Sequence, residues 1–195
     1  MKFRLTNEKI EQDGITFYRI QAVETFGNVA AGELGGYVEK ESNLSHNDLS
    51  WIYNNAKVYG NAKVYEDAWI HGDAQIYEDA WIHGDAQIYG DAQIYGNARI
   101  YGNAQICGDA QIYGDAYINE NKNVFWIPKI GSRLSTLTVY RTNDSFVIVN
   151  TGCFSGSLEQ FEKAVRKTHG DNKFAQEYMA IIQYVKLKFD MLDLN

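Results

Sequence analysis

Two pairs of side chains in this sequence are candidates for catalytic chemistry. His71 and His83 each follow a Trp-Ile pair in the dodecapeptide EDAWIHGDAQIY, which is repeated without change from residue 66 to residue 89. A histidine beside a substrate cleft can act as a general base for acyl transfer. Cys153 and His169 would combine a thiol nucleophile with a base. Whether either pair is catalytic depends on the residues around it.

The surrounding sequence argues against catalysis by either pair. His71 and His83 occupy a repeat position that is otherwise mostly Tyr, and no insertion interrupts the repeats between residues 52 and 118 to shape a cleft. No third group accompanies Cys153 and His169, so we interpret them as a buried cysteine beside a histidine that ends a helix. Cys107 stands in another Tyr position. We predict no catalytic residue.

Acidic residues also recur at a fixed spacing that could form a cation site. Asp73, Asp91 and Asp109 are spaced by eighteen residues, and a stacked row of carboxylates is a candidate cation site. Asn replaces Asp at the same repeat position, as at Asn55 and Asn97. Both residues favour turns, so the pattern indicates turn chemistry rather than charge. We predict no metal site and no cofactor.

Composition limits the range of partners. The 195 residues carry a formal net charge of −7, and ten acidic but only three basic residues lie between Trp51 and Glu120. This acidic middle disfavours binding to a nucleic-acid backbone. Two cysteines make no disulfide framework, and no apolar run has the length of a signal peptide or membrane span. We expect a soluble cytoplasmic protein with no membrane partner.

The elements that position these residues follow from a six-residue repeat. Ala recurs at every sixth position from Ala56 to Ala116, and Ile or Val stands two residues after each Ala. In a strand, Ala and Ile then point to one side while the residues between and after them point to the other. Gly with Asp or Asn supplies a corner. The repeat predicts a mainly β protein, with a triangular parallel β-helix of eighteen residues per coil.

An eighteen-residue coil explains the duplicated dodecapeptide. Twelve residues are two thirds of a coil, so the two copies lie on different faces and cannot form one stacked site. Trp69 then falls in the column of Trp51, and Trp81 in that of Lys63 and Arg99. We interpret the duplication as growth of the rod. The same arithmetic predicts one outward column of tyrosines on a single face, made of Tyr59, Tyr77, Tyr95 and Tyr113.

The ends of the chain depart from the repeat. We predict a β-hairpin cap in residues 1–31, the β-helix in residues 32–121, and a small α+β domain in residues 122–195. In the last part, VFWIPKIG and LTVYRTNDSFVIVNTG are typical of strands, with a turn at residues 142–144. Ser157-Leu158-Glu159-Gln160 is a capping box that opens a helix to about Thr168. A second helix is expected over residues 173–192.

The Ala-X-Ile pattern resembles that of hexapeptide-repeat, left-handed β-helix proteins. It departs from them in having Tyr or His directly after the branched residue, with Gly one place later, so a right-handed, bactofilin-like coil is the alternative. FGNVAAGELGGYVEKESNLS together with the Tyr-Gly-Asn/Asp-Ala repeats resembles phage and prophage proteins described as polymer-forming cytoskeletal or acyltransferase-like. The tail, with IGSR, GCFSGSLEQFEKAV and HGDN, resembles a phage-associated domain of unknown function. The resemblance implies a phage origin and no catalytic residues.

These observations favour a non-enzymatic binding protein of phage type, and we expect a homotrimer. The resemblance to hexapeptide-repeat proteins, many of which are trimeric acyltransferases, implies as the alternative a trimeric acyltransferase that uses His71 or His83. Its candidate role is counter-defence, either by occupying a host immune protein or by sequestering a small nucleotide signal. A structural filament is a further alternative. The tyrosine column and two tryptophans are the candidate contact residues on the rod, and four basic residues are the candidate cations of the tail. These residues are Tyr59, Tyr77, Tyr95, Tyr113, Trp69, Trp81, Arg133, Arg141, Arg166 and Lys167.

Overall fold

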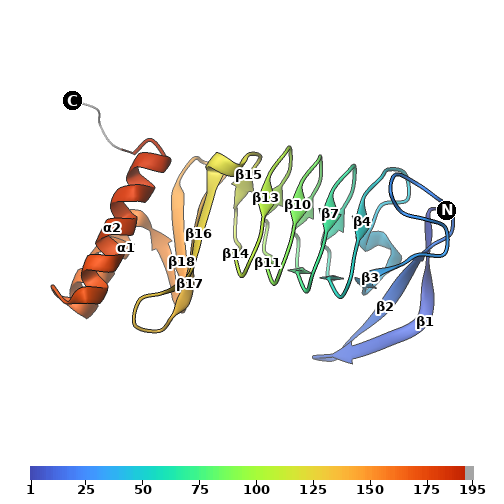
Figure 1. The fold of residues 1–195 in the computed structure, drawn as a ribbon, viewed down its shortest axis with the longest axis horizontal. Helices are drawn as coiled ribbons and strands as arrows, with labels where there is room; N and C mark the ends of the chain where they lie inside the picture. Colours follow the sequence, from blue (N-terminus) through green and yellow to red (C-terminus); the bar gives the residue numbers. More distant parts are fainter. Residues whose placement is uncertain (192–195) are drawn as a thin grey trace.

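Very short parallel strands, stacked every eighteen residues, build a three-sided rod at the centre of the molecule (Figure 1). The computed structural model describes residues 1–191. The first face consists of β3 (Leu34–Val38), β5 (Lys57–Val58), β8 (Gln75–Ile76), β11 (Gln93–Ile94) and β14 (Gln111–Ile112). The second consists of β4 (Trp51–Ile52), β7 (Trp69–Ile70), β10 (Gln87–Ile88) and β13 (Gln105–Ile106). The third consists of β6 (Lys63–Val64), β9 (Trp81–Ile82), β12 (Arg99–Ile100) and β15 (Tyr117–Ile118).

The predicted parallel β-helix is therefore confirmed, and its register is the predicted one. Trp69 pairs with Trp51 across β7 and β4, and Arg99 pairs with Trp81 across β12 and β9. The Ala and the branched residue of every hexad point inward and are fully buried in one continuous core. A narrow apolar interior of this kind is the main source of stability, because each coil buries its surface only against its neighbours.

A left-handed backbone turns the chain at each corner. Gly72, for instance, has φ +74°, and a Cβ atom there would lie 2.7 Å from the carbonyl oxygen of Gly90 in the next coil. Glu66 and Glu78 take the same position with φ near +59° and +58°. Their carboxylates accept hydrogen bonds from the amides of Gly84 and Gly96 respectively, each one coil later and at 2.8 Å. An acid at this position thus stabilises a corner amide of the next coil.

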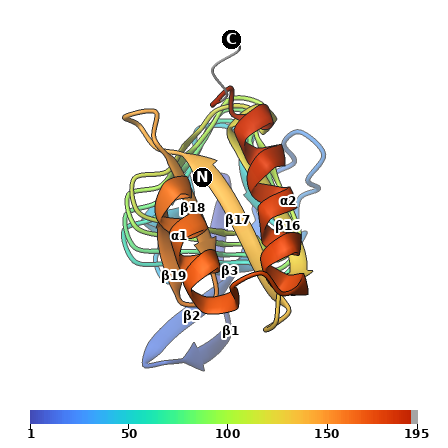
Figure 2. The ribbon, with the colours of Figure 1, turned by 90° about the vertical axis from the view of Figure 1, so that its left-hand side faces the viewer.

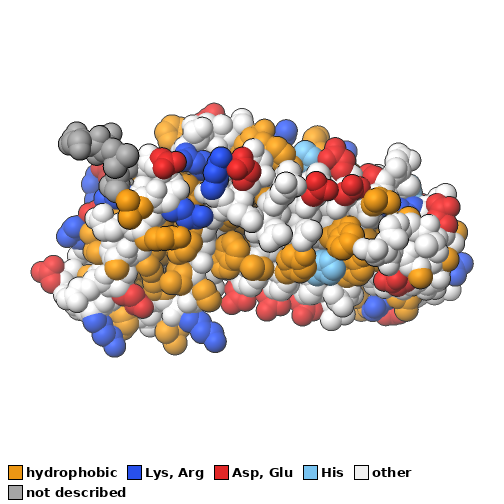
Figure 3. Space-filling view, turned by 45° about the horizontal axis from the view of Figure 1, so that its top comes forward, with side chains coloured by type: hydrophobic (Ala, Val, Ile, Leu, Met, Phe, Trp, Pro, Cys, Tyr) orange, Lys and Arg blue, Asp and Glu red, His pale blue; other side chains and the backbone are white. Residues whose placement is uncertain are grey.

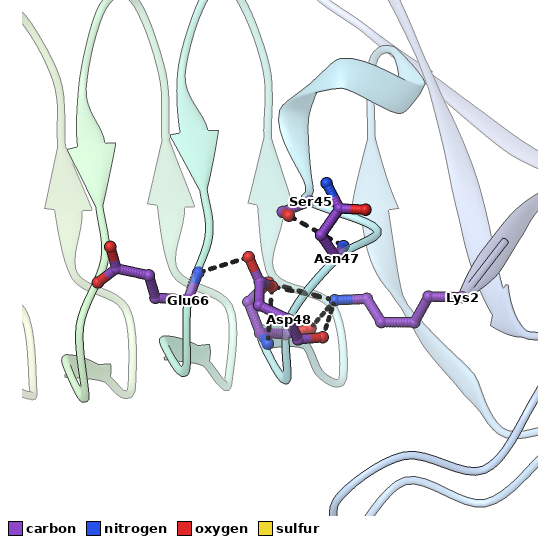
Figure 4. A network of polar contacts seen from close by, with 6 residues as sticks. Lys2, Ser45, Asn47, Asp48 and Glu66 are labelled. Carbon is purple, nitrogen blue, oxygen red and sulfur yellow. Dashed lines mark hydrogen bonds and ion pairs between the residues drawn. The ribbon is translucent and has the colours of Figure 1, made fainter.

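The N-terminal segment closes one end of the rod. A hairpin of β1 (Phe3–Gln12) and β2 (Ile15–Ala22) pairs antiparallel with β3, so it continues the first face beyond the coils. A short 3₁₀ helix (Glu41–Asn43) follows in the irregular first coil. The buried Lys2 ammonium donates to the carbonyl oxygens of Asp48 and Ser50 at 3.0 and 2.7 Å (Figure 4). Asp48 in turn accepts from the amide of Glu66 at 2.7 Å, which ties the cap to the coils.

The C-terminal segment forms a sheet and two helices at the other end. A second 3₁₀ helix (Asn121–Asn123) leads into an antiparallel sheet with helices packed on its far side (Figures 1 and 2). The elements are β16 (Val124–Ile130), β17 (Ser135–Arg141), β18 (Val147–Thr151), β19 (Phe154–Ser157), α1 (Leu158–His169) and α2 (Lys173–Lys188). Ser157 caps α1 through the predicted capping box, and Asn172 caps α2. The sequence did not predict the strand β19. The second helix ends at Lys188, before the expected residue 192, which lies outside the described residues.

Side chains of the sheet form hydrogen bonds with backbone groups that the last coil leaves unpaired. Thr138 accepts a hydrogen bond from the amide of Gln111 at 3.0 Å. The hydroxyl of Tyr140 donates to the carbonyl oxygen of Tyr113 at 2.8 Å and accepts from the amide of Asn150 at 2.7 Å. These side chains are buried and replace the hydrogen bonds that a further coil would make. The C-terminal domain is therefore the cap of the rod at this end.

No helix within residues 1–191 combines the length and the apolar character that crossing a bilayer requires.

Candidate functional site

A cavity of about 350 Å³ opens in the C-terminal domain between α1 and two turns of the sheet. The turn between β16 and β17 contributes Ser132 and Arg133, and the turn between β18 and β19 contributes Gly152 and Cys153. Pockets that bind small ligands usually combine an apolar body with a few converging polar groups. This cavity, called the tail pocket below, has both.

Apolar side chains of the helix and the sheet form the body of the tail pocket. Phe161 and Val165 belong to the buried face of α1, and Phe154 stands on β19. The rings of Phe154 and Phe161 lie 5.2 Å apart between centroids, and the ring of Tyr178 meets Phe161 edge-on at 5.4 Å. Aromatic surface is therefore concentrated on one side of the cavity, where a flat apolar group could pack.

The backbone of Gly131 packs directly against the side chain of Tyr178. A Cβ atom on Gly131 would lie 1.8 Å from the Tyr178 hydroxyl oxygen, and Gly131 has φ +71°. The amide of Gly131 also donates to the carboxylate of Glu177 at 3.1 Å, so this turn is fixed against α2. Burial and the nearby Glu177 raise the pKa of Tyr178, so its hydroxyl stays neutral and can donate a hydrogen bond.

Polar groups of both turns lie together at the rim. The guanidinium of Arg133 approaches the sulfur of Cys153 at 3.6 Å, although the two residues are twenty positions apart. Cys153 is exposed, which corrects our expectation of a buried cysteine. The reason is local: β18 and β19 are joined by a tight turn with Gly152 at φ +55°, and the thiol stands at its outer end. His169 ends α1 as expected, and its ring lies 5.8 Å from that of Tyr178.

The charge of the tail pocket contrasts with that of the whole chain. The described residues that line it include Arg133 and His169 but no Asp or Glu, while the chain as a whole has a net charge of −7. Hydroxyl groups of Ser132, Ser135 and Thr168 add hydrogen-bond donors. Figure 3 shows acidic side chains along one edge of the rod and hydrophobic ones gathered over the C-terminal end. The arrangement is complementary to an anion that carries an apolar group.

The other predicted cations of the tail do not join Arg133. Arg141 donates to the carbonyl oxygens of Ser145 and Phe189 and lies over the Phe189 ring, so its role is to fix the end of α2. Arg166 pairs with Glu162 one helical turn earlier at 3.0 Å. Lys167 is exposed on α1 and does not line the pocket. Sequence spacing could not distinguish Arg133 from these residues, because its neighbours come from distant turns.

The predicted tyrosine column is present on the first face. Tyr59, Tyr77, Tyr95 and Tyr113 lie in line, with centroid distances of 4.9, 4.7 and 4.8 Å and nearly parallel rings. Each ring therefore covers the face of its neighbour, and the column presents hydroxyls and ring edges rather than flat faces. Burial, with the adjacent Tyr95 and Tyr59, raises the pKa of Tyr77, so the Tyr77 hydroxyl stays protonated.

Trp69 and Trp81 stand apart from this column and from each other. Trp69 belongs to β7 on the second face and Trp81 to β9 on the third. The indole of Trp81 is flanked by Lys63 and Arg99, whose charged groups lie 5.6 and 4.9 Å from the ring centroid. The structure thus does not gather the predicted contact residues of the rod into one surface.

The two candidate histidines occupy the tyrosine position of their coils, as predicted. His71 lies between Tyr53 and Tyr89 with centroid distances of 4.2 and 5.0 Å, and burial lowers its pKa. His83 lies between two tyrosine rings in the same way. Its Nδ1 atom is 3.4 Å from the carboxylate of Glu66. Both imidazoles thus belong to aromatic stacks.

Among residues 1–191, no three His, Cys, Asp or Glu side chains come together in a way that could hold a metal ion. The acidic corners are paired with amides in some coils instead. Asn61 donates to Asp79 at 3.1 Å, and Asn97 donates to Asp115 at 3.0 Å. Because amide and carboxylate alternate along this corner, neighbouring coils are joined by neutral–anionic hydrogen bonds.

Comparison with known proteins gives a match within the rod. Residues 92–108 match the family described as YdcK Beta solenoid repeat. No curated protein matches the chain. The matched segment covers nearly one coil, from Ala92 to Gly108, and includes the strands β11, β12 and β13. With the stacked parallel strands of the three faces, it identifies the chain as a β-solenoid repeat protein that carries a C-terminal sheet and two helices.

Proposed function

We propose that this chain is a non-enzymatic binding protein, and that its tail pocket sequesters a small ligand with a flat apolar ring and an anionic group. A nucleotide has this chemistry. One observation carries the proposal: within a strongly acidic chain, the lining of the pocket has Arg133 and His169 and, in the part of the chain described, no carboxylate. An anion would meet the positive charge of Arg133 there, whereas the rod, with ten acidic and three basic residues between Trp51 and Glu120, would repel it.

The geometry supports separate roles for the two sides of the pocket. The base would pack against Phe154 and Phe161, whose rings form the apolar wall. The phosphate would meet the guanidinium of Arg133, whose planar group suits bidentate contact with phosphate oxygens. In the phage-like group that the sequence resembles, such sequestration would remove a nucleotide signal of host immunity. The rod then serves as the scaffold that presents the domain.

Isothermal titration calorimetry tests this proposal. The ligands are AMP, GMP, CMP and UMP, each compared with its nucleoside. We expect at least one nucleotide to bind more tightly than its nucleoside, by tenfold to about a hundredfold, which is the range for charge-assisted hydrogen bonds. Arg133→Ala should abolish that difference. Arg166→Ala removes a guanidinium from α1 outside the pocket and is the matched control. Equal binding of nucleotides and nucleosides would refute the proposal.

Native mass spectrometry of the protein purified from bacterial cells addresses the assembly. The proposed homotrimer would give a mass of three chains, and a retained ligand would add a small increment to it. A trimer without added mass would move the proposal toward a host protein as the partner. A single-chain mass would contradict the trimer.

A trimeric acyltransferase is the alternative, and the pair formed by Glu66 and His83 favours it. A carboxylate 3.4 Å from the Nδ1 atom can orient an imidazole as a general base. The faces of that imidazole are covered by Tyr65 and Tyr101, which leaves its edge for a substrate. Acyl-CoA turnover that disappears in His83→Ala and persists in His71→Ala would establish this alternative.

A further inference from the structure

A second concave surface runs along the rod and is independent of the tail pocket. Two cavities, of about 340 and 580 Å³, lie on the third face and share Asp79 and Trp81 in their linings. The first reaches Lys40 in the irregular coil, and the second reaches Asp144 in the turn between β17 and β18. Together they form one groove, called the corner groove below, that extends along the axis of the rod.

The walls of the corner groove repeat with the coils. Asn61, Asp79, Asn97 and Asp115 succeed one another along one corner, and two pairs among them are joined by amide-to-carboxylate hydrogen bonds. Stacked strands are about 4.8 Å apart, so the three steps from Asn61 to Asp115 span about 14 Å. The groove therefore offers a polar group at each coil over the length of an extended chain rather than of a single small molecule.

The charges of the corner groove balance. Its lining has three cations, Lys40, Lys63 and Arg99, and three carboxylates, those of Asp79, Asp115 and Asp144. A balanced surface gives no net attraction to a polyanion or a polycation. The described lining also has amides that donate and accept, and carboxylates that accept. Repeated donors and acceptors without net charge are complementary to a neutral polymer that carries hydroxyl groups on every unit.

Aromatic side chains complete the surface. Trp81 and Tyr117 line the groove from β9 and β15, and both side chains are partly exposed. Lys63 and Arg99 lie over the Trp81 indole, so the partly exposed ring presents mainly its edge to the groove. Hydrogen-bonding groups at successive coils beside aromatic ring edges match a sugar unit, which carries both hydroxyl and C–H groups.

We infer that the corner groove binds a neutral oligosaccharide or polysaccharide chain that lies along the axis of the rod. Each sugar unit would meet the amide or carboxylate of about one coil, and the turn at Asn143 and Asp144 would close the groove at the C-terminal end. That turn is fixed to the last coil, because the amide of Asn143 donates to the carbonyl oxygen of Asp115 at 3.2 Å. The site needs no ligand in the tail pocket.

Affinity electrophoresis of the full chain tests the inference. Native gels contain dextran, hydroxyethyl cellulose, laminarin or galactomannan as neutral polymers, and heparin as the charged reference. Asp79→Ala removes a carboxylate that both cavities share, and we expect binding about tenfold weaker, as for one charged hydrogen-bonding group. Asp79→Asn keeps the shape and most hydrogen bonds, and should bind nearly as the unchanged protein does.

The matched control is Asp91→Ala, which removes a carboxylate from the same hexad position at another corner, outside the groove. Circular dichroism and melting of the Asp79 and Asp91 variants establish that both fold. The inference requires retardation by at least one neutral polymer, weakened in Asp79→Ala and not in Asp91→Ala. Retardation by none of them, retardation by heparin alone, or equal effects of the two Ala variants would overturn it.

Discussion

Removal of a single oxygen atom from Tyr140 should loosen the cap of the rod. In Tyr140→Phe the ring stays in its buried site, and only the hydroxyl is lost. That hydroxyl donates to the carbonyl oxygen of Tyr113 at 2.8 Å and accepts from the Asn150 amide at 2.7 Å. Burial raises the pKa of Tyr140 to about 12, so the group is a neutral donor at any ordinary pH.

The expected magnitude follows from the partners left behind. The carbonyl of Tyr113 loses its side-chain donor, and Asn150 is itself buried, with an Oδ1 atom that already has no partner among the described residues. Leaving a buried polar group unsatisfied costs about 1–3 kcal/mol. The backbone amide of Tyr113 also loses the hydroxyl as an acceptor, at 3.4 Å. Because three groups are affected and one small void forms, we expect the free energy of unfolding to fall by about 2–4 kcal/mol.

Urea denaturation followed by circular dichroism measures this loss, with Tyr184→Phe as the control. Tyr184 is 48% exposed on α2, so removal of its hydroxyl should change the free energy of unfolding by less than about 0.5 kcal/mol. Hydrogen exchange of the Tyr113 and Gln111 amides should accelerate in Tyr140→Phe before that of the central coils. If both Phe variants lose the same stability, or if neither does, the capping role assigned to Tyr140 is wrong.

Three further predictions concern the aromatic stack of His71, the contact of Gly131 with Tyr178 at the tail pocket, and the corner residue Glu78. Burial lowers the pKa of His71 in the folded protein below the ordinary 6.5. As the pH falls through 6.5, the unfolded chain therefore binds more protons than the folded one. The stability that the neutral ring contributes is complete above pH 6.5 and is lost below it. His71→Tyr should therefore raise the urea midpoint more at pH 5.5 than at pH 8, and an equal rise at both would contradict this. Gly131→Ala should displace Tyr178 and lower the melting temperature. The new Cβ would lie 1.8 Å from the Tyr178 hydroxyl oxygen, and the backbone of residue 131 has φ +71°. An unchanged melting temperature in calorimetry would contradict this prediction. Glu78→Ala should lower the free energy of unfolding by about 1 kcal/mol, since the amide of Gly96 loses its carboxylate acceptor, and urea denaturation with exposed Glu11→Ala as reference measures the difference.

The rod was predictable from the sequence because its information is local and repeated. Ala and Ile at fixed hexad positions determine which side chains point inward, and the eighteen-residue coil then determines which outward residues share a column. The same arithmetic places Glu66 one coil before Gly84, so a Glu in the glycine position followed by Gly eighteen residues later is a readable signal for the corner hydrogen bond. Parallel stacking of the tyrosine rings also follows from that register.

The tail pocket was not predictable in the same way. Arg133, Cys153 and Tyr178 meet there through packing between two turns and a helix, and no period relates their positions. A hydrophobic pattern also could not show that Cys153 would stand at the exposed end of a turn, or that Phe154–Ser157 would add a fourth strand. The capping box at Ser157 was readable because its hydrogen bonds join residues only three positions apart.

Alkylation of the two cysteines tests most directly whether the tail pocket is a binding site. Cys153 lines the pocket, whereas Cys107 lies at the end of the second face, and both thiols are exposed and serve as internal references for each other. The rate of iodoacetamide modification at each thiol is measured by mass spectrometry, with and without the nucleotide that binds best in calorimetry. The account predicts that the nucleotide slows modification of Cys153 severalfold and leaves Cys107 unchanged. Unchanged rates at both thiols, or equal slowing of both, would contradict it.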